Sequence, residues 1–237
     1  MEISSSSITN NNTITGTKTG QIGMAQENDT TLKAAVTLAN NGTINLSGSN
    51  SAGIYAKDSN ATNVVTPAVA ATGTTPASPL VKAQISLEKT KSAGIYSVLT
   101  NLASGDKKIL NEANGTDKAT IEIGANATSS AGMYGKVEST ATKVLTLENA
   151  GDIQVGSTSS VGIYTENEAN DKEKLVAENK GLINVTKESS VGMYSSKEST
   201  IKNTGLAVNG KGIVLLAKKT AAMIGNIRSE VKNTGDI

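Results

Sequence analysis

One repeated motif constrains the fold of this chain more than any other feature. Residues 148–164 read ENAGDIQVGSTSSVGIY, and residues 178–194 read ENKGLINVTKESSVGMY. Each copy joins two half-motifs, apolar-x-Asn-x-Gly-x-Ile-x-Val and Ser-small-Gly-Ile/Met-Tyr, whose glycines are eleven residues apart. The same offset occurs in four places: Asn12/Gly23 (with Asn in place of the first glycine), Gly42/Gly53, Gly151/Gly162 and Gly181/Gly192. The sequence therefore predicts a tandem array of one structural unit.

Apolar and polar residues alternate within each copy, which is the period of a β-strand. The clearest run is residues 36–46, and no window has helical spacing long enough to compete. We predict coils of about 24 to 30 residues with three short strands each, stacked into parallel sheets that are buried only by their neighbours. A single coil buries too few aliphatic side chains to offset the conformational entropy of its residues, so the repeat is needed for folding.

An asparagine lies in phase with the buried positions of the first half-motif. The six copies are Asn10, Asn40, Asn149, Asn179, Asn203 and Asn233. A buried amide is costly unless it is hydrogen-bonded, and stacked asparagines can bond to one another. We expect an internal asparagine ladder at a corner of the coil, with a structural role.

The copies are unevenly spaced, which indicates loops inserted into a constant cross-section. We predict a single β-helix fragment over residues 1–237, with a frayed N-terminus at residues 1–7 and two loop insertions, 57–82 and 97–118. The first insertion holds all three prolines, Pro67, Pro76 and Pro79, which cannot lie in a central strand. Gly212-Ile213 is interpreted as the second half-motif of the seventh copy. The last residues, VKNTGDI, stop within a repeat, so a longer parent chain is expected.

Composition excludes several classes of function. The chain has no Cys and no His, which excludes a disulfide framework, cysteine-based zinc sites and the commonest general base and metal ligand. Its 22 Lys and Arg balance 21 Asp and Glu without long blocks of either sign, which argues against nucleic acid or an anionic membrane as the main partner. No signal peptide or transmembrane helix is recognised, and no cofactor or metal is predicted.

Paired carboxylates are the only candidates for catalysis. Glu166 with Glu168, and Asp171 with Glu173, are interleaved with lysines after Tyr164. A glycosidase needs two carboxyls across a cleft, one with a raised pKa, whereas alternating charges are typical of a solvated loop. We predict no catalytic residues.

The tyrosines are the candidate binding residues. All five end the second half-motif: Tyr55, Tyr96, Tyr134, Tyr164 and Tyr194. If Ala52/Ile54, Val161/Ile163 and Val191/Met193 face inward, alternation directs the tyrosines outward, one above another at about 4.8 Å per coil. They then form either an aromatic ladder covered by the following loops or a stripe that binds sugars or a partner. The third possibility is that the faces are reversed and the tyrosines are core.

The segments NNGTINLSGSNSAGIYA, NAGDIQVGSTSSVGIYT and NKGLINVTKESSVGMYS resemble the passenger repeats of large type V autotransporter adhesins of Gram-negative bacteria, particularly the fusobacterial kind. The resemblance implies a right-handed parallel β-helix, here of about seven coils with two extruded loops. It also implies a virulence-associated adhesin, secreted by Sec and displayed on the extracellular face of the outer membrane. The anchor would be a β-barrel that this sequence does not contain.

We therefore expect a non-enzymatic autotransporter passenger, a stalk that mediates adhesion through a host-cell or bacterial surface protein or glycan, without nucleic acid. Two alternatives stay open. One is a β-helical polysaccharide-cleaving enzyme, although Arg228 is the only arginine that could serve it. The other is a purely structural spacer.

Overall fold

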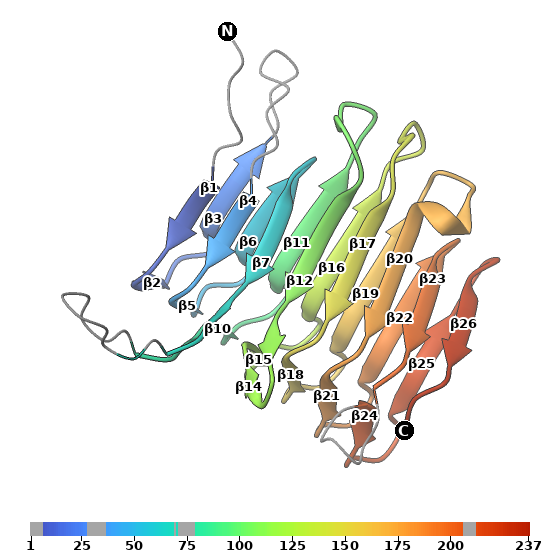
Figure 1. The fold of residues 1–237 in the computed structure, drawn as a ribbon. Helices are drawn as coiled ribbons and strands as arrows, with labels where there is room; N and C mark the ends of the chain where they lie inside the picture. Colours follow the sequence, from blue (N-terminus) through green and yellow to red (C-terminus); the bar gives the residue numbers. More distant parts are fainter. Residues whose placement is uncertain (1–6, 28–36, 69, 71–78, 206–211) are drawn as a thin grey trace, which may run out of the picture.

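The computed structural model describes residues 7–27, 37–68, 70, 79–205 and 212–237. These residues form a right-handed parallel β-helix of about seven coils, as expected (Figure 1). Each coil contributes one strand to each of three parallel sheets, called A, B and C in the order in which the chain visits them. Strands that are far apart in the sequence thus lie side by side along a single axis.

The strands are short and follow one another regularly. Sheet A contains β1 (Ser7–Asn10), β4 (Thr37–Asn40), β7 (Asn60–Asn63), β12 (Lys107–Asn111), β17 (Leu145–Asn149), β20 (Leu175–Asn179), β23 (Thr200–Asn203) and β26 (Glu230–Asn233). Sheet B contains β2 (Thr13–Gly16), β5 (Thr43–Leu46), β10 (Gln84–Leu87), β15 (Thr120–Ile123), β18 (Asp152–Val155), β21 (Leu182–Val185) and β24 (Gly212–Leu215). Sheet C contains β3 (Ile22–Glu27), β6 (Ala52–Lys57), β11 (Ala93–Leu99), β16 (Ala131–Val137), β19 (Val161–Asn167), β22 (Val191–Lys197) and β25 (Ala221–Gly225). A 3-10 turn, η1 (Lys172–Lys174), precedes β20.

The interior is a narrow aliphatic column in which like residues stack on like. In sheet B the isoleucines of successive coils pair in exact register and are at most 1% exposed: Ile44, Ile85, Ile121, Ile153, Ile183 and Ile213. Each interior side chain is therefore covered by the coils on either side, which explains why the fold requires repetition.

The predicted asparagine ladder is confirmed and is longer than expected. Each Nδ2 donates to the Oδ1 of the asparagine in the next coil, at 2.7 to 2.9 Å. Two rungs were missed because they lie in the segments interpreted as loops: Asn63 and Asn111. The eight side chains are 9% exposed in Asn10, buried from Asn40 to Asn203, and exposed in Asn233.

Both loop insertions are shorter than predicted. Residues 57–82 include strand β7, and residues 97–118 include strand β12, so sheet A continues unbroken through both. Residues 100–106 join β11 to β12 at the corner between sheets C and A. The other extra residues lie at the corner between sheets A and B. There the antiparallel pairs β8 (Val65–Thr66) with β9 (Val81–Lys82) and β13 (Ala113–Asn114) with β14 (Asp117–Lys118) leave the coil. The spacing hid these coils because β7 lacks the large aliphatic residues of the other copies.

Two smaller predictions are also corrected. Ser7, predicted to be frayed, is the first residue of β1, and residues 1–6 lie outside the described residues. Gly212-Ile213 does not form a second half-motif, because β24 pairs with β21 in sheet B. The second half-motif of that coil is β25, where Met223 pairs with Met193 and Ile224 takes the place of a tyrosine.

Candidate ligand-binding groove

The serine of the second half-motif builds the corner between sheets B and C. The backbone N–H of each serine donates to the Oγ of the serine in the next coil, at 3.0 to 3.2 Å, through Ser51, Ser92, Ser130, Ser160 and Ser190. The residue before each serine has a left-handed backbone, with φ between +53° and +58° in Asn50, Lys91, Ser129, Ser159 and Ser189. This second ladder was not predicted, although a serine at the same place in five successive motifs was a signal for it.

The glycine of this half-motif interrupts the alternation of the strand. A Cβ on Gly162 would lie 2.5 Å from the carbonyl oxygen of Gly192 and 2.7 Å from Cγ2 of Ile183 in the core. Gly162 therefore points inward, and so does Ile163, which is fully buried. The residue before the glycine consequently faces outward. The prediction that Ile54, Ile163 and Met193 face inward is confirmed, since all three are fully buried. The same prediction for Ala52, Val161 and Val191 is wrong, because Ala52 and Val161 line an external groove and Val191 pairs in register with Val161.

The tyrosines face outward, as predicted, and form one column on sheet C. The ring centroids of successive tyrosines are 4.8 to 5.6 Å apart. The rings of Tyr134, Tyr164 and Tyr194 are stacked, with interplanar angles of 15° and 22°. All five side chains are half-buried, so the possibility of a tyrosine core is wrong. The rings of Tyr55 and Tyr96 are tilted by 47° to each other, and those of Tyr96 and Tyr134 by 51°, so this part of the column is not stacked face to face.

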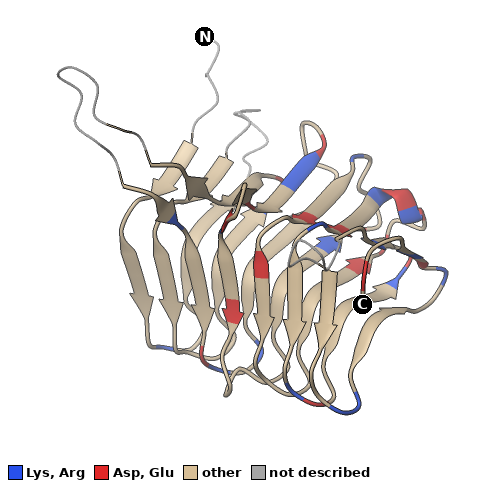
Figure 2. Ribbon diagram, turned by 60° about the horizontal axis from the view of Figure 1, so that its bottom comes forward, with Lys and Arg blue, Asp and Glu red and all other residues tan. Residues whose placement is uncertain are grey.

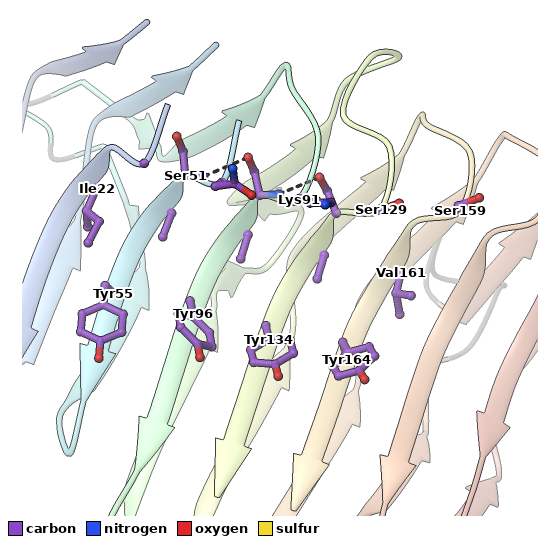
Figure 3. Close-up of a pocket in the computed structure, with 17 residues that line it drawn as sticks. Ile22, Ser51, Tyr55, Lys91, Tyr96, Ser129, Tyr134, Ser159, Val161 and Tyr164 are labelled. Atoms are coloured by element: carbon purple, nitrogen blue, oxygen red, sulfur yellow. Dashed lines mark hydrogen bonds between the residues drawn. The ribbon is translucent and has the colours of Figure 1, made fainter. Parts of the chain in front are cut away.

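A groove of about 610 Å³ runs beside this column, between the tyrosines and the serine corner (Figure 3). Its floor carries the methyl groups of Ala52, Ala93 and Ala131. The larger side chains of Ile22 and Val161 stand at its two ends. The tyrosine wall is formed by Tyr55, Tyr96, Tyr134 and Tyr164, so four of the five predicted residues meet at one site; Tyr194 continues the column beyond it.

The electrostatics of the groove are nearly neutral. Burial raises the pKa of Tyr55 and of Tyr96 above that of a free phenol. Burial and a 2.5 Å hydrogen bond to Oε2 of Glu166 raise the pKa of Tyr134 further. The phenols of Tyr55, Tyr96 and Tyr134 are therefore protonated at neutral pH. Apart from them, Lys91 is the one ionisable side chain among the lining residues.

The paired carboxylates are arranged differently from the prediction. Glu166 lies on strand β19, not in a loop, and its carboxylate accepts a hydrogen bond from the Tyr134 hydroxyl. Lys136 Nζ lies 3.6 Å from Glu166 and 3.1 Å from Glu168. The pKa of Lys136 is raised, and the hydrogen bond to Glu168 is the largest cause. Asp171 accepts the backbone N–H of Glu173 at the start of η1. The carboxylates of Glu166, Glu168 and Asp171 therefore already bind other groups of this protein.

Charged residues elsewhere form alternating pairs along the surface. Figure 2 shows blue and red segments interspersed over the visible coils. Glu148 lies 3.0 Å from both Lys108 and Lys180, one coil to either side. Partial burial opposes its ionisation, but the two lysines outweigh burial and lower its pKa. In the described part of the chain no three acidic side chains are grouped as a metal site.

The two hairpins at the corner between sheets A and B form a second candidate surface. Lys82 Nζ lies 2.8 Å from Asp117 Oδ1, which joins the first hairpin to the second. Glu112 Oε2 accepts the backbone N–H of Val65 at 2.7 Å. Beneath them Val65, Ala83 and Ala119 form a small buried cluster. The insertions are thus held side by side.

Residues 1–209 match the family model described as the BigA third pectate lyase-like domain. The chain belongs to this family. The family groups the chain with domains of bacterial surface proteins, and its pectate lyase-like fold agrees with the parallel β-helix described above. No curated protein and no solved structure matches the chain. Among the described residues, no helix has the length and apolarity needed to cross a bilayer.

Proposed function

We propose that this BigA-type domain is a non-enzymatic adhesive segment of an autotransporter passenger, displayed on the outer face of the outer membrane. The proposal includes two further points: the repeats are of the fusobacterial autotransporter type, and the domain contributes to virulence. The observation that supports adhesion most directly is the groove on sheet C, where four half-buried tyrosines form a wall beside a floor of alanine methyl groups. Ligand-binding sites are typically concave, with an apolar lining and a few placed polar groups, as in this groove.

The rigid stack supports display of a binding surface. In sheet C the strands β6, β11, β16 and β19, which carry the groove, pair in register, so the site keeps its geometry across these coils. The joined hairpins at the other corner extend the surface that can contact a host-cell or bacterial partner, since loops on a rigid scaffold tolerate variation. The partner class is a surface protein or glycan.

The absence of enzymatic activity is proposed from the state of the carboxylates. A general acid needs a carboxyl with a raised pKa, whereas the pKa of Glu148 is lowered by its lysine partners. Glu166 is occupied by Tyr134 and Lys136. The rival function, cleavage of polysaccharide, is favoured only by the pectate lyase-like fold of the family.

Adherence of domain-coated beads to epithelial cells and to bacterial cells tests the proposal. We expect the wild-type domain to promote adherence and Tyr96→Ala to reduce it. A matched control is Lys108→Ala on sheet A, which should leave adherence unchanged. In parallel, the domain is incubated with polysaccharides and their chain length is measured. No adherence above uncoated beads would contradict adhesion, and shortened polysaccharide chains would contradict a non-enzymatic role.

A further inference from the structure

We propose that the groove on sheet C binds a neutral, linear glycan that runs along the β-helix axis with about one sugar unit per coil. This inference rests on the proposed adhesive function and names the class of its ligand. It is carried by three features of the groove: the shape of its floor, the chemistry of its two walls, and its repeat distance.

The floor is shaped by one position of the repeat. The residues before the glycine pair in register through the coils as Ile22, Ala52, Ala93, Ala131, Val161 and Val191. Small side chains in the second, third and fourth coils leave a hollow, and the larger side chains before and after it close the ends. The groove is therefore a local property of these coils and not a general feature of the fold.

The two walls have different chemistry. One wall is the row of tyrosine rings, which is apolar where it meets the floor (Figure 3). The other wall carries one exposed polar side chain per coil: Asn50, Lys91, Ser129 and Ser159. A sugar ring matches this arrangement, because its C–H groups form an apolar surface while its hydroxyls lie at the edge. Binding sites generally combine an apolar lining with a few placed polar groups in this way.

The repeat distance favours a glycan over a peptide. The tyrosines recur every 4.8 to 5.6 Å, which is close to the advance of one pyranose unit in an extended chain. An extended peptide rises about 3.3 Å per residue, so its side chains would not keep step with the coils. The backbone groups of β11 are already paired with β6 and β16, and would leave a peptide's own amides without partners.

Charge favours a neutral chain over a polyanion. A chain with one acidic group per sugar needs a row of cations, and the lining residues contain only Lys91. An acyl chain would fit the floor but would leave the four polar side chains of the rim without a role. The groove thus selects a ligand with one apolar side and hydroxyls along its edge.

The proposal is tested by isothermal titration of the whole 237-residue chain with defined probes. The probes are β-1,4-linked oligosaccharides of glucose and of N-acetylglucosamine, from disaccharide to hexasaccharide, with oligogalacturonate as the polyanion. We expect the neutral series to bind, with affinity rising up to about the tetrasaccharide and then levelling off, because four tyrosines and four polar rim residues line the groove. Tighter binding of oligogalacturonate, or no binding of either neutral series, would show that the ligand class is wrong.

Substitutions in the floor supply the site-specific test. Ala93→Val fills the hollow, and the fold should tolerate it because Val161 occupies the equivalent position. We expect affinity to fall about tenfold or more. The matched control is Ala39→Val, on the outer side of sheet A, which should bind as the wild type does. Val161→Ala should lengthen the groove and shift the plateau to a longer oligosaccharide.

The outcomes separate this inference from the proposed function. If Ala93→Val abolishes bead adherence while no oligosaccharide binds, the groove is adhesive and the glycan is wrong. If oligosaccharides bind and Ala93→Val lowers their affinity without changing bead adherence, the glycan site is supported and the adhesive role of the groove is wrong. Unchanged oligosaccharide binding by Ala93→Val would overturn the proposed site.

Discussion

The asparagine ladder gives the sharpest test of how the coils are held together. The Asn149 side chain is fully buried and bonds in both directions along the axis. Its Oδ1 accepts from Asn111 at 2.8 Å, and its Nδ2 donates to Asn179 Oδ1 at 2.7 Å and to the carbonyl oxygen of Leu182 at 3.2 Å. Asn149→Ala would remove all three hydrogen bonds.

The expected loss of stability follows from what remains buried. In the variant, Asn111 Nδ2 keeps two carbonyl acceptors, at 3.1 and 3.3 Å, so this donor loses only one of its three hydrogen bonds. Asn179 Oδ1 loses the one side-chain or backbone donor that the described residues offer it. Leaving a buried acceptor unpaired costs about 1 to 3 kcal/mol, and the lost hydrogen bonds add about 1 kcal/mol. We therefore expect Asn149→Ala to lower the free energy of unfolding by about 2 to 4 kcal/mol.

Urea denaturation of the variant and the wild type measures this difference. The matched control is Asn41→Ala, because Asn41 Nδ2 donates to Asn11 Oδ1 at 2.9 Å on the exposed surface. That substitution should change stability by no more than about 0.5 kcal/mol. Hydrogen exchange of the Gly181 amide, which donates to the Asn149 carbonyl, reports the same loss locally. If Asn149→Ala is as stable as Asn41→Ala, the ladder does not stabilise the coils and the reasoning fails.

Three further experiments test the assignment of faces and charges. Ile163→Asp should prevent folding or secretion because Ile163 is fully buried, while Tyr164→Ala should leave the circular dichroism of the coil intact; the reverse result would invert the strand. Gly162→Ala should destabilise by about 1 to 3 kcal/mol through overpacking, whereas Gly105→Ala, with open space around its Cβ, should match the wild type in thermal melts. Because the pKa of Glu148 is lowered on folding, its contribution is present above the ordinary value of 4.5 and lost as pH falls through the lowered pKa. Glu148→Gln should therefore differ from the wild type in melting temperature at neutral pH and converge with it in acid; a constant difference would contradict this.

Much of the fold could be predicted from the sequence because its information is local and periodic. Alternation within each copy predicted the strands, and the phase of Asn149 and Asn179 predicted a ladder that the hydrogen bonds confirm. The missed rungs, Asn63 and Asn111, stand in strands whose neighbours are atypical, so periodicity alone gave them no support. Their assignment depended on pairing with sheet A strands already in place.

The sequence predicted the tyrosines of the candidate site but not the groove beside them. The column of tyrosines followed from a motif that ends in tyrosine in five successive coils, since a regular stack must place equivalent residues in line. The groove beside it depended on the direction of the residue before the glycine, and simple alternation predicts the wrong side for Val161.

The sequence by itself thus determined the repeat, the sheets and the residues that lie in line along the axis, because those depend on spacing along the chain. Tertiary structure decided where the coil departs from alternation and which corners carry the extra residues. The physical reason lies between coils: the close approach of Gly162 to the carbonyl of Gly192 is part of a turn of the strand that directs two consecutive residues, Gly162 and Ile163, inward, so the preceding residue, Val161, faces outward. The spacing of residues within one copy of the repeat does not reveal a contact between two copies.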